Sequence, residues 1–425
     1  MHQNRPRFTR IVAAVLALST THLAMAQTQS DLHRDAATRN VGNDAFMMKY
    51  ARAFYCNLPD NNNAIVIAAR ATNSVRIPLT QIFDNVWYVG SRYVGQYMIK
   101  TDTGIVQVDA GNNAAEMQNY NYPALQSLGV SASYPLKAVL LTHGHGDHDG
   151  GAMYLRDNFN PQFFLGSGDL GSGKPYSPTP IDSTDLSMRQ LSIGGMPITV
   201  LPTPGHTPGS TSAVLTVKDG GKDVKVLING GQSMTSSIPQ VAQYLDSIER
   251  TYAMAKATHV DGVMTPHVYW DGSQIMLDDV NARGRTSPSQ FIYGHETVLR
   301  QLAVARECSA AWLTKLDATA VLPVWRVNTI AFLGGNPTPN KVAAKLQNGW
   351  GALASQKVSF SVPETGASCT ATTNADGVAS CDIHPLRPHK DKVTASFAGA
   401  TSAGFVDLPA ETTALACSNG NCKTN

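Results

Sequence analysis

The sequence has few charged residues and no marked excess of either sign. Asp, Glu, Lys and Arg together make up 15% of the 425 residues, and the formal net charge is +2. Proteins that bind nucleic acid or anionic membranes through electrostatics usually have a strong excess of Lys and Arg. We therefore expect neither nucleic acid nor an acidic membrane surface as a partner.

Long apolar runs are also lacking. No stretch after residue 26 approaches the roughly 20 apolar residues that a membrane-spanning helix needs. The N-terminus has basic residues between Arg5 and Arg10, a short apolar run from Ile11 to Leu18, and then Ala24-Met25-Ala26. This order is typical of a secretory signal peptide with its cleavage site. We predict a signal peptide over residues 1–26 and a soluble, exported product that is either periplasmic or secreted.

Cysteine is scarce, with six residues in the chain. An exported protein meets an oxidising compartment, so disulfides are expected. Six cysteines allow many pairings, and the sequence does not choose among them. Local spacing favours two neighbouring pairs and leaves a third by elimination: Cys369 with Cys381, Cys417 with Cys422, and Cys56 with Cys308.

Strands and helices alternate as far as about residue 319. Two segments with apolar residues at helical spacing, Val241–Ala255 and Val298–Trp312, have Pro239 and Pro288 near their expected starts. The pattern predicts an α/β fold, with sheets packed between helices, over residues 27–319. The first strands are expected to form an antiparallel meander: Ile82–Val89, Gln96–Lys100 and Ile105–Val108.

From residue 320 the pattern changes to short β-type runs such as Val358–Val362 and Lys392–Phe397. A helical period is found there only over Lys341–Leu346. Such spacing is typical of a small all-β sandwich, which we predict over residues 320–425.

The most informative segment is Thr142-His143-Gly144-His145-Gly146-Asp147-His148-Asp149-Gly150-Gly151, which follows a predicted buried strand. It places three imidazoles and a carboxylate within six residues. Imidazole and carboxylate are zinc ligands, and the interleaved glycines let the loop bend so that these side chains converge. Without a metal, such a cluster would leave several partly desolvated polar groups unpaired. The segment predicts a metal site.

Two further histidines are candidates for the remaining ligands. His206 lies in Thr203-Pro204-Gly205-His206-Thr207-Pro208-Gly209-Ser210, between two predicted strands, and His267 follows the strand-like Asp261–Met264. Either histidine alone would more often be structural. Beside the first cluster, a histidine in a loop at the end of a strand is where the other ligands of two metals are expected.

These motifs resemble the metallo-β-lactamase superfamily. The resemblance rests on the H-x-H-x-D-H segment, the Thr-Pro-Gly-His-Thr-Pro-Gly-Ser turn and Val108-Asp109-Ala110-Gly111, and it covers about Ile82–Trp312. It implies an αββα sandwich, with two mixed sheets between helices, and two Zn²⁺ per chain. The implied ligands are His143, His145 and His206 for the first zinc and Asp147, His148 and His267 for the second.

The segment between His206 and His267 separates branches of this superfamily. Hydrolases such as glyoxalase II have an Asp at the end of the intervening strand, and one β-lactamase subclass has a Cys. Here the strand end reads Leu227-Ile228-Asn229-Gly230-Gly231-Gln232-Ser233-Met234, with neither. This is similar to the third, B3-like subclass. The resemblance implies a zinc-dependent hydrolase that opens a β-lactam ring through attack by a zinc-bound hydroxide, which Asp147 orients.

Two residues outside the ligand set have alternative readings. Asp109 resembles a family residue that orients the metal loop, but it could equally be a turn carboxylate at the end of a strand. Third-subclass enzymes usually have serines that hold the substrate carboxylate after the intervening strand, and this chain departs from that pattern. Ser233 could replace them, or it could be a plain loop serine.

Other functions remain open. A lactone or another ester could be the small-molecule substrate of the same metals. A function of another class is a surface-binding protein with a vestigial metal domain. The segment Ser368–Cys381, with its Asn-Ala-Asp-Gly turn, resembles bacterial immunoglobulin-like repeats. Such a domain would either contact a surface or partner, or serve as a spacer.

The glycine-rich segment Gly166–Lys174 matches two nucleotide-binding patterns only superficially. Gly166-Ser167-Gly168-Asp169-Leu170-Gly171 fits the dinucleotide fingerprint, but the residues that follow cannot begin a helix. In the P-loop alignment, Pro175 stands where Ser or Thr would bind Mg²⁺. We predict a flexible loop, at the mouth of the site.

Overall fold

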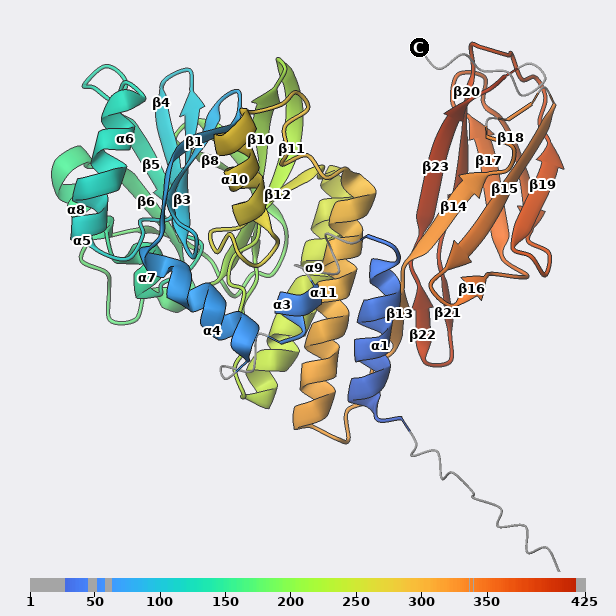
Figure 1. The fold of residues 1–425 in the computed structure, drawn as a ribbon, viewed down its shortest axis with the longest axis horizontal. Coiled ribbons are helices and arrows are strands. Elements are labelled where there is room, and N and C mark those ends of the chain that lie inside the picture. Colours follow the sequence, from blue (N-terminus) through green and yellow to red (C-terminus); the bar gives the residue numbers. More distant parts are fainter. Residues whose placement is uncertain (1–26, 45–51, 58–62, 336, 339, 418–425) are drawn as a thin grey trace, which may run out of the picture.

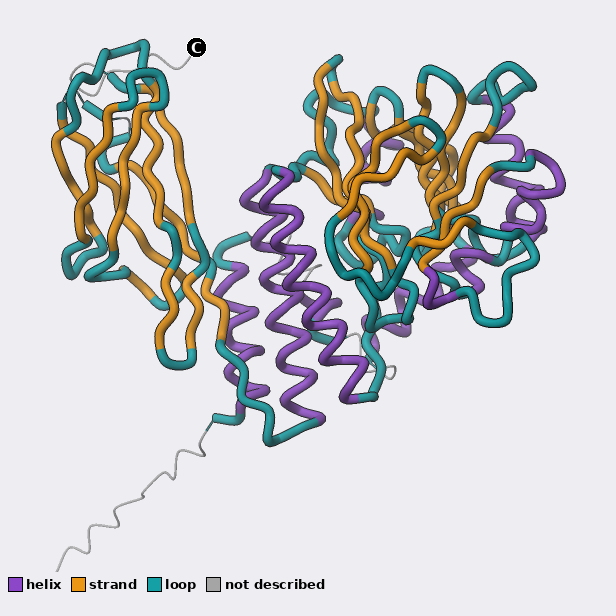
Figure 2. The backbone as a smooth tube through the Cα atoms, turned by 180° about the vertical axis from the view of Figure 1, so that it is seen from behind, coloured by secondary structure: helices purple, strands orange, loops and turns teal. Residues whose placement is uncertain are grey.

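The computed structural model describes residues 27–44, 52–57, 63–335, 337–338 and 340–417. The predicted signal peptide and Cys422 lie outside these ranges. Within them, none of the helices combines the length and the apolar character that crossing a membrane would require. Figures 1 and 2 show two sheets flanked by helices and, on the far side of the longest helices, a region built of strands.

The first sheet has seven strands in sequential order. The first four pair antiparallel, and the last three continue the sheet in parallel. The strands are β1 (Arg76–Phe83), β2 (Val86–Ser91), β3 (Gly95–Thr101), β4 (Gly104–Val108), β5 (Leu136–Leu140), β6 (Gln162–Gly166) and β7 (Thr179–Ile181). The antiparallel meander is therefore confirmed.

The prediction of a single strand over Ile82–Val89 was wrong. The chain turns at Asp84-Asn85, and the two halves belong to β1 and β2, with Phe83 paired to Val86. Asp and Asn favour turns because their side chains hydrogen-bond nearby backbone groups. The Asn85 side chain also ties the turn to β3, because its amide donates a hydrogen bond to the carbonyl of Lys100 at 3.2 Å. Apolar residues on both sides of the turn concealed it in the sequence.

The second sheet has five strands in the order β12-β11-β10-β9-β8. They are β8 (Arg189–Ile193), β9 (Met196–Pro202), β10 (Thr211–Asp219), β11 (Lys222–Ile228) and β12 (Gly262–Met264). Along β11, Val226 and Ile228 face the core between the two sheets, whereas Leu227 faces the helices outside. Successive side chains of a strand point to opposite faces, so each sheet fills two cores.

Helices cover the outer face of each sheet, which is the predicted αββα arrangement. Outside the first sheet lie α5 (Ala114–Glu116), α6 (Tyr122–Ser127) and α8 (Ala152–Phe159). Outside the second lie α9 (Ile238–Thr258) and α11 (His295–Leu316), with α1 (Gln29–Val41) packed against α11. Three further helices are α3 (Ala53–Tyr55), α4 (Ala64–Ala71) and α10 (Ser273–Arg283).

The two amphipathic helices were predicted with one error. Pro239 lies in the first turn of α9, as expected. Pro288 does not begin α11, because that helix starts at His295. Gly294, at a φ of 85°, directly precedes the helix, and the intervening residues form a loop. Pro288 is therefore a loop residue, and α11 begins later than the position of this proline suggested.

After α11 the described chain consists of strands. They are β13 (Val324–Arg326), β14 (Asn328–Phe332), β15 (Lys341–Asn348), β16 (Gly351–Ala352), β17 (Lys357–Val362), β18 (Ala367–Thr372), β19 (Val378–Asp382), β20 (Lys392–Phe397), β21 (Ala400–Ser402), β22 (Phe405–Asp407) and β23 (Ala410–Leu415). The expected helical period over Lys341–Leu346 was wrong. Val342, Ala344 and Leu346 are buried in alternation with more exposed neighbours, which is the pattern of a strand. The immunoglobulin-like assignment and the domain boundary stay predictions.

Buried polar contacts hold this β-rich region against the helices. Glu307 of α11 and His33 of α1 are fully buried, with Oε2 and Nδ1 2.7 Å apart. The other oxygen of Glu307 accepts hydrogen bonds from Arg306 at 2.7 Å and from the backbone N–H of Trp325 in β13 at 2.9 Å. The Trp325 ring lies 5.2 Å from that of Tyr252. The β-rich region therefore shares a core with the helical layer.

Two of the three disulfides favoured by the sequence lie within the described residues and are confirmed. Cys56–Cys308 joins the segment after α3 to α11, and Cys369–Cys381 joins β18 to β19. The cysteines of the first disulfide are 252 residues apart in the sequence, and those of the second are 12 residues apart. The expected Cys417–Cys422 pair includes a residue outside the described ranges.

Replacing Cys56 and Cys308 together by alanine is expected to destabilise the αββα layers by about 2–4 kcal/mol, because the closed loop restricts the unfolded chain. Hydrogen exchange should then become faster in α9 and α11. The matched control, Cys369→Ala with Cys381→Ala, should accelerate exchange in β18 and β19 instead. The same exchange pattern in both double variants would contradict this assignment.

Candidate metal centre

Six candidate ligands come from loops at neighbouring ends of the two sheets. His143 and His145 lie between β5 and the short helix α7 (Gly146–Asp149), which carries the other two ligands of this segment. His206 lies in the turn between β9 and β10, and His267 follows β12. The first sheet therefore supplies four of the six side chains, Asp147 and His148 included, and the second sheet supplies two.

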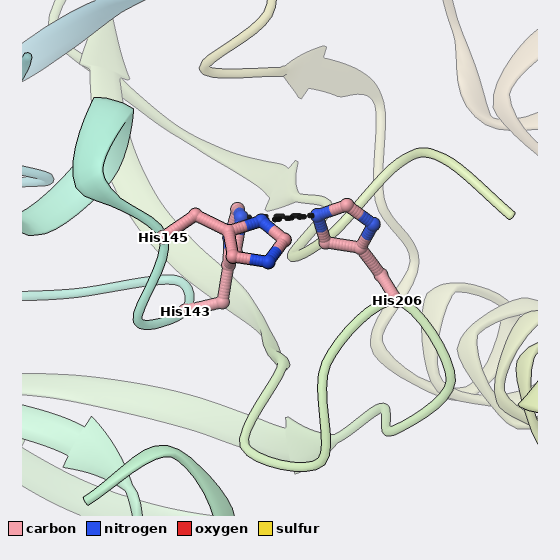
Figure 3. Close-up of side chains that lie close together, drawn as sticks. All are labelled: His143, His145 and His206. Carbon is pink, nitrogen blue, oxygen red and sulfur yellow. Dashed lines mark hydrogen bonds between the residues drawn. The ribbon is translucent and has the colours of Figure 1, made fainter. Parts of the chain in front are cut away.

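The first trio converges closely. Nε2 of His206 lies 3.1 Å from Nε2 of His143 and 3.1 Å from Nδ1 of His145. Figure 3 shows the three rings meeting, with His206 reaching in from the opposite loop. His143 is buried, whereas His145 is exposed. The trio is therefore open to solvent on the side of His145.

The second trio adjoins the first. Nε2 of His148 lies 3.1 Å from Nε2 of His267, and Oδ2 of Asp147 lies 3.4 Å from Nε2 of His267 and 3.6 Å from Nε2 of His148. The ring centroids of His143 and His148 are 4.0 Å apart. All six side chains that the sequence singled out are thus brought together.

Hydrogen bonds fix which ring nitrogens face the centre. His206 Nδ1 lies 2.8 Å from the carbonyl oxygen of Ser233, and His267 Nδ1 lies 3.2 Å from that of Tyr93. Since a carbonyl oxygen can only accept, both Nδ1 atoms must carry hydrogen. His148 Nδ1 lies 2.7 Å from Oδ2 of Asp109, which holds that ring in the same way. The Nε2 lone pairs of these rings therefore point into the centre.

This donor set fits a divalent transition metal. Lone pairs that face each other at 3.1 Å repel unless a cation lies between them. Nitrogens bound to one tetrahedral zinc at about 2.0–2.1 Å would be about 3.3 Å apart, close to the spacing observed. Ligand histidines also commonly donate the other N–H to a carboxylate or a carbonyl. By this test, the first trio could hold one ion. Asp147, His148 and His267 together could hold another.

Burial keeps most of these imidazoles neutral. Burial lowers the pKa of His206 to about 4 and that of His267 to about 3, and it lowers the pKa of His143 as well. The pKa of His148 is raised, because the contact with Asp109 outweighs the opposing effect of burial. Burial also opposes ionisation of Asp147, but His148 and His267 outweigh it and lower the pKa of this carboxyl. Neutral imidazoles and a carboxylate are the forms that bind metal.

Asp109 connects the end of β4 to the metal loop. It is fully buried and lies in the left-handed region at a φ of 62°, which Asp and Asn tolerate better than most residues. Its Oδ1 accepts a hydrogen bond from the backbone N–H of Thr142 at 2.7 Å, while Oδ2 holds His148. Of the two readings open at Asp109, these contacts favour orientation of the metal loop.

Ser233 lies behind His206. Its carbonyl accepts from His206 Nδ1, and its hydroxyl is 3.3 Å from the same nitrogen. Both contacts are on the side of the ring away from the converging nitrogens. Gly231 also approaches His206 closely, since a Cβ on this glycine would lie 2.7 Å from the Cβ of His206. These contacts favour a role for Ser233 in holding the imidazole over one in binding a substrate carboxylate.

Several contributors to the site were missed in the sequence. Tyr93 acts through its backbone carbonyl, which no side-chain pattern reveals. Asp169 and Lys174 contact the backbone of Gly144, although their segment was predicted to be a flexible loop.

Hydrogen bonds between the sheets reach the ligand loops directly. The backbone N–H of Thr211 in β10 donates to the carbonyl of Thr142 at 2.9 Å. The Tyr97 hydroxyl in β3 donates to the carbonyl of Thr265 at 2.8 Å, and Gly95 N–H donates to that of Pro266 at 3.0 Å. The loop of each sheet is therefore anchored to the other sheet next to the candidate ligands.

Comparison with known families agrees with this geometry. Residues 92–222 match the model of the metallo-beta-lactamase superfamily. A hydroxyacylglutathione hydrolase of Anaeromyxobacter dehalogenans is 31% identical over 102 residues, which are 24% of this chain and 37% of that protein. The probable metallo-hydrolase YqgX of Bacillus subtilis is 29% identical over 164 residues, covering 35% of this chain and 74% of that protein.

The chain covers only 37% and 55% of the length of two curated relatives, the hydroxyacylglutathione hydrolase and the uncharacterised YobT of Bacillus subtilis. Among solved structures, BJP-1, a subclass B3 metallo-beta-lactamase of Bradyrhizobium japonicum, is 24% identical with a TM-score of 0.42, over 59% of this chain and 98% of that one. The metallo-beta-lactamase GOB-18 from Elizabethkingia meningoseptica is 21% identical with a TM-score of 0.45, over 58% and 95%.

Asp109→Asn is expected to lower zinc affinity by about 10–100-fold, because an amide offers one acceptor oxygen where the carboxylate offers two. Either His148 or Thr142 would lose its acceptor, while the left-handed backbone remains accessible to Asn. Competition with a chromophoric chelator measures this. Asp102→Asn, in the exposed turn between β3 and β4, is the control and should bind zinc normally. Equal affinities in the two variants would exclude the orienting role.

The loop after His267 contains a second buried carboxyl. Asp271 is fully buried and accepts a hydrogen bond from the backbone N–H of Ser273 at 2.9 Å. Burial raises the pKa of Asp271 to about 6, whereas the unfolded chain should have a value of about 3.9. Between these values the folded protein holds a proton that the unfolded chain releases. The contribution of this carboxyl to stability therefore falls as the pH rises through this window.

Wild-type protein without zinc is expected to lose up to about 1.4 kcal/mol of unfolding free energy per pH unit, relative to Asp271→Asn, between about pH 4 and 6. Above that window the difference should stay constant. Urea unfolding at several pH values measures it, and Asp376→Asn, in an exposed turn, is the control. Parallel pH profiles for wild type and Asp271→Asn would show that this carboxyl titrates normally.

Proposed function

We propose that this protein is a dinuclear zinc hydrolase that opens the ring of a β-lactam. The observation that carries the proposal is the composition of the converging set, with His143, His145 and His206 beside Asp147, His148 and His267. Asn229 directly follows β11, so the end of this strand offers the centre no carboxylate or thiolate. In the superfamily that the chain resembles, this combination is similar to the third β-lactamase subclass.

In the proposed reaction, some residues would hold the ions and Asp147 would act on the attacking water. When bound, a zinc pair supplies polarisation of a carbonyl group and a lowered pKa for water. The imidazoles, in their neutral forms, would hold the ions, with the outer nitrogens of His148, His206 and His267 fixed by Asp109, Ser233 and Tyr93. The Asp147 side chain is 30% exposed, and its lowered pKa keeps it ionised. It would orient the attacking water and accept its proton.

Substrate would approach from the side of His145. This residue and Gly146 are exposed, whereas His143, His148 and the base of the loop are buried. A cyclic amide carbonyl placed there would lie next to the water that Asp147 orients. Attack on the carbonyl carbon breaks the ring C–N bond, and the proton held by Asp147 can then be passed to the leaving nitrogen.

A second candidate function is hydrolysis of a lactone or another ester by the same residues. It is favoured by the relative named hydroxyacylglutathione hydrolase, which shares 31% identity over 102 residues. The contacts of Ser233 favour it too, because they leave the recognition of a β-lactam carboxylate without an assigned residue.

The proposal also includes export of the protein and a non-catalytic role for the β-rich region. The disulfides Cys56–Cys308 and Cys369–Cys381 are of the kind that forms in an oxidising compartment, which supports export to the periplasm or the medium. We assign no catalytic residue to the β-rich region. It would act as a support for the helical layer or as a surface that contacts a partner.

Turnover of a chromogenic cephalosporin tests the proposal. The zinc-loaded protein should hydrolyse it, a chelator should abolish turnover, and added zinc should restore it. His206→Ala should lower kcat/KM by more than about 100-fold, since losing a ligand should exceed the effect of losing an outer contact. His259→Ala, an exposed imidazole at the end of α9, is the matched control and should retain activity.

A substrate panel separates the alternatives. Zinc-dependent turnover of lactones or esters, with no turnover of penicillins, carbapenems or cephalosporins, would show that the substrate is an ester rather than a β-lactam. No hydrolysis of any of these by zinc-loaded protein would favour the surface-binding function instead.

A further inference from the structure

The glycine-rich segment Gly166–Lys174 is packed against the candidate ligand loops. Ser167–Asp169 forms a single helical turn directly after β6. A Cβ on Gly166 or Gly168 would collide with the backbone of Gly209 or Pro208, in the turn that carries His206. These glycines therefore allow two backbones to lie in direct contact, which explains the motif without any nucleotide.

Asp169 joins the two ligand loops through three hydrogen bonds. Its Oδ2 accepts from the backbone N–H of Gly144 and from the Thr207 hydroxyl, both at 2.7 Å. Its Oδ1 accepts from the backbone N–H of Gly209, also at 2.7 Å. Gly144 separates His143 from His145, and Thr207 directly follows His206. A single carboxylate thus contacts the chain next to all three residues of the first trio.

Lys174 completes the hold on Gly144. Its Nζ lies 3.2 Å from the Gly144 carbonyl oxygen and 2.6 Å from Oδ2 of Asp149, which also accepts from the Tyr176 hydroxyl at 2.8 Å. Both backbone polar groups of Gly144 are therefore bound by side chains of one segment. This matters because a glycine between two ligands can otherwise rotate freely and change the angle between their rings.

The second trio is held by different groups. Asp109 contacts His148, and the Tyr93 carbonyl contacts His267. The three partners of Asp169 lie in Gly144 and in the His206 turn. Asp169 can therefore be changed without removing the contacts that hold His148 and His267, whereas Lys174 also reaches α7 through Asp149.

We propose that Asp169, assisted by Lys174, is a positioning residue for the first metal site. It holds His143, His145 and His206 in a geometry that suits the ion before the ion binds. The inference rests on the proposed metal centre and adds a residue that acts on one site of the two.

The test measures zinc affinity of Asp169→Asn in two backgrounds, by competition with a chromophoric chelator. With His267→Ala, the first trio remains intact, and Asp169→Asn should weaken zinc binding by about 10–100-fold. With His206→Ala, the second trio remains intact, and Asp169→Asn should leave zinc affinity unchanged. Asn fits poorly because its amide nitrogen would face N–H or O–H donors.

Controls separate positioning from general destabilisation. Asp182→Asn removes an exposed loop carboxylate that accepts hydrogen bonds from the backbone and the hydroxyl of Thr184, and it should leave zinc affinity unchanged in both backgrounds. Thr207→Val removes one of the three contacts of Asp169 and should give a smaller loss with the same selectivity. If circular dichroism shows that Asp169→Asn does not fold, Thr207→Val decides the question.

Three results would overturn the inference. Equal loss of zinc affinity in both backgrounds would mean that Asp169 supports the fold in general, and no loss in either would mean that it does not position the ligands. If the His267→Ala protein itself binds no zinc, the proposed metal centre fails, and a role for Asp169 in that site fails with it.

Discussion

The centre depends on the acceptors that hold the outer nitrogens of the buried imidazoles. Asp109, the Ser233 carbonyl and the Tyr93 carbonyl each bind an Nδ1 atom and so direct an Nε2 lone pair inward. Without them, the rings could turn and pair with each other or with water. The glycine-spaced loop brings the histidines together, but these acceptors decide that the histidines present lone pairs rather than hydrogens.

The sequence predicted the members of the cluster better than their supports. His143, His145, Asp147 and His148 stand within six residues, and local spacing alone indicates that they converge. His206 and His267 were found because each follows a strand. The supports were harder to predict, because the Tyr93 and Ser233 contacts are made by backbone carbonyls. Asp169 was concealed in a segment whose glycines suggested mobility, whereas they permit close packing.

The fold was predictable where periodicity was long and ambiguous where it was short. The helix over Ile238–Thr258 has a sustained apolar face, and its first turn contains a proline. The hairpin at Asp84-Asn85 was missed because apolar residues continue on both sides of the turn. Lys341–Leu346 is too short to distinguish a period of two from one of 3.6, and pairing with β14 and β19 makes it a strand.

The split origin of the candidate ligands makes the core between the sheets part of the site. Four side chains follow strands of one sheet and two follow strands of the other, while Val106, Leu140, Ala213 and Ile228 pack between them. That apolar layer sets the distance between the two ligand loops. A methyl group added or removed there would change the distance between the ligand atoms that an ion must span, although no polar residue is altered. Adaptation of this centre to a new metal or substrate could therefore begin in its hydrocarbon interior.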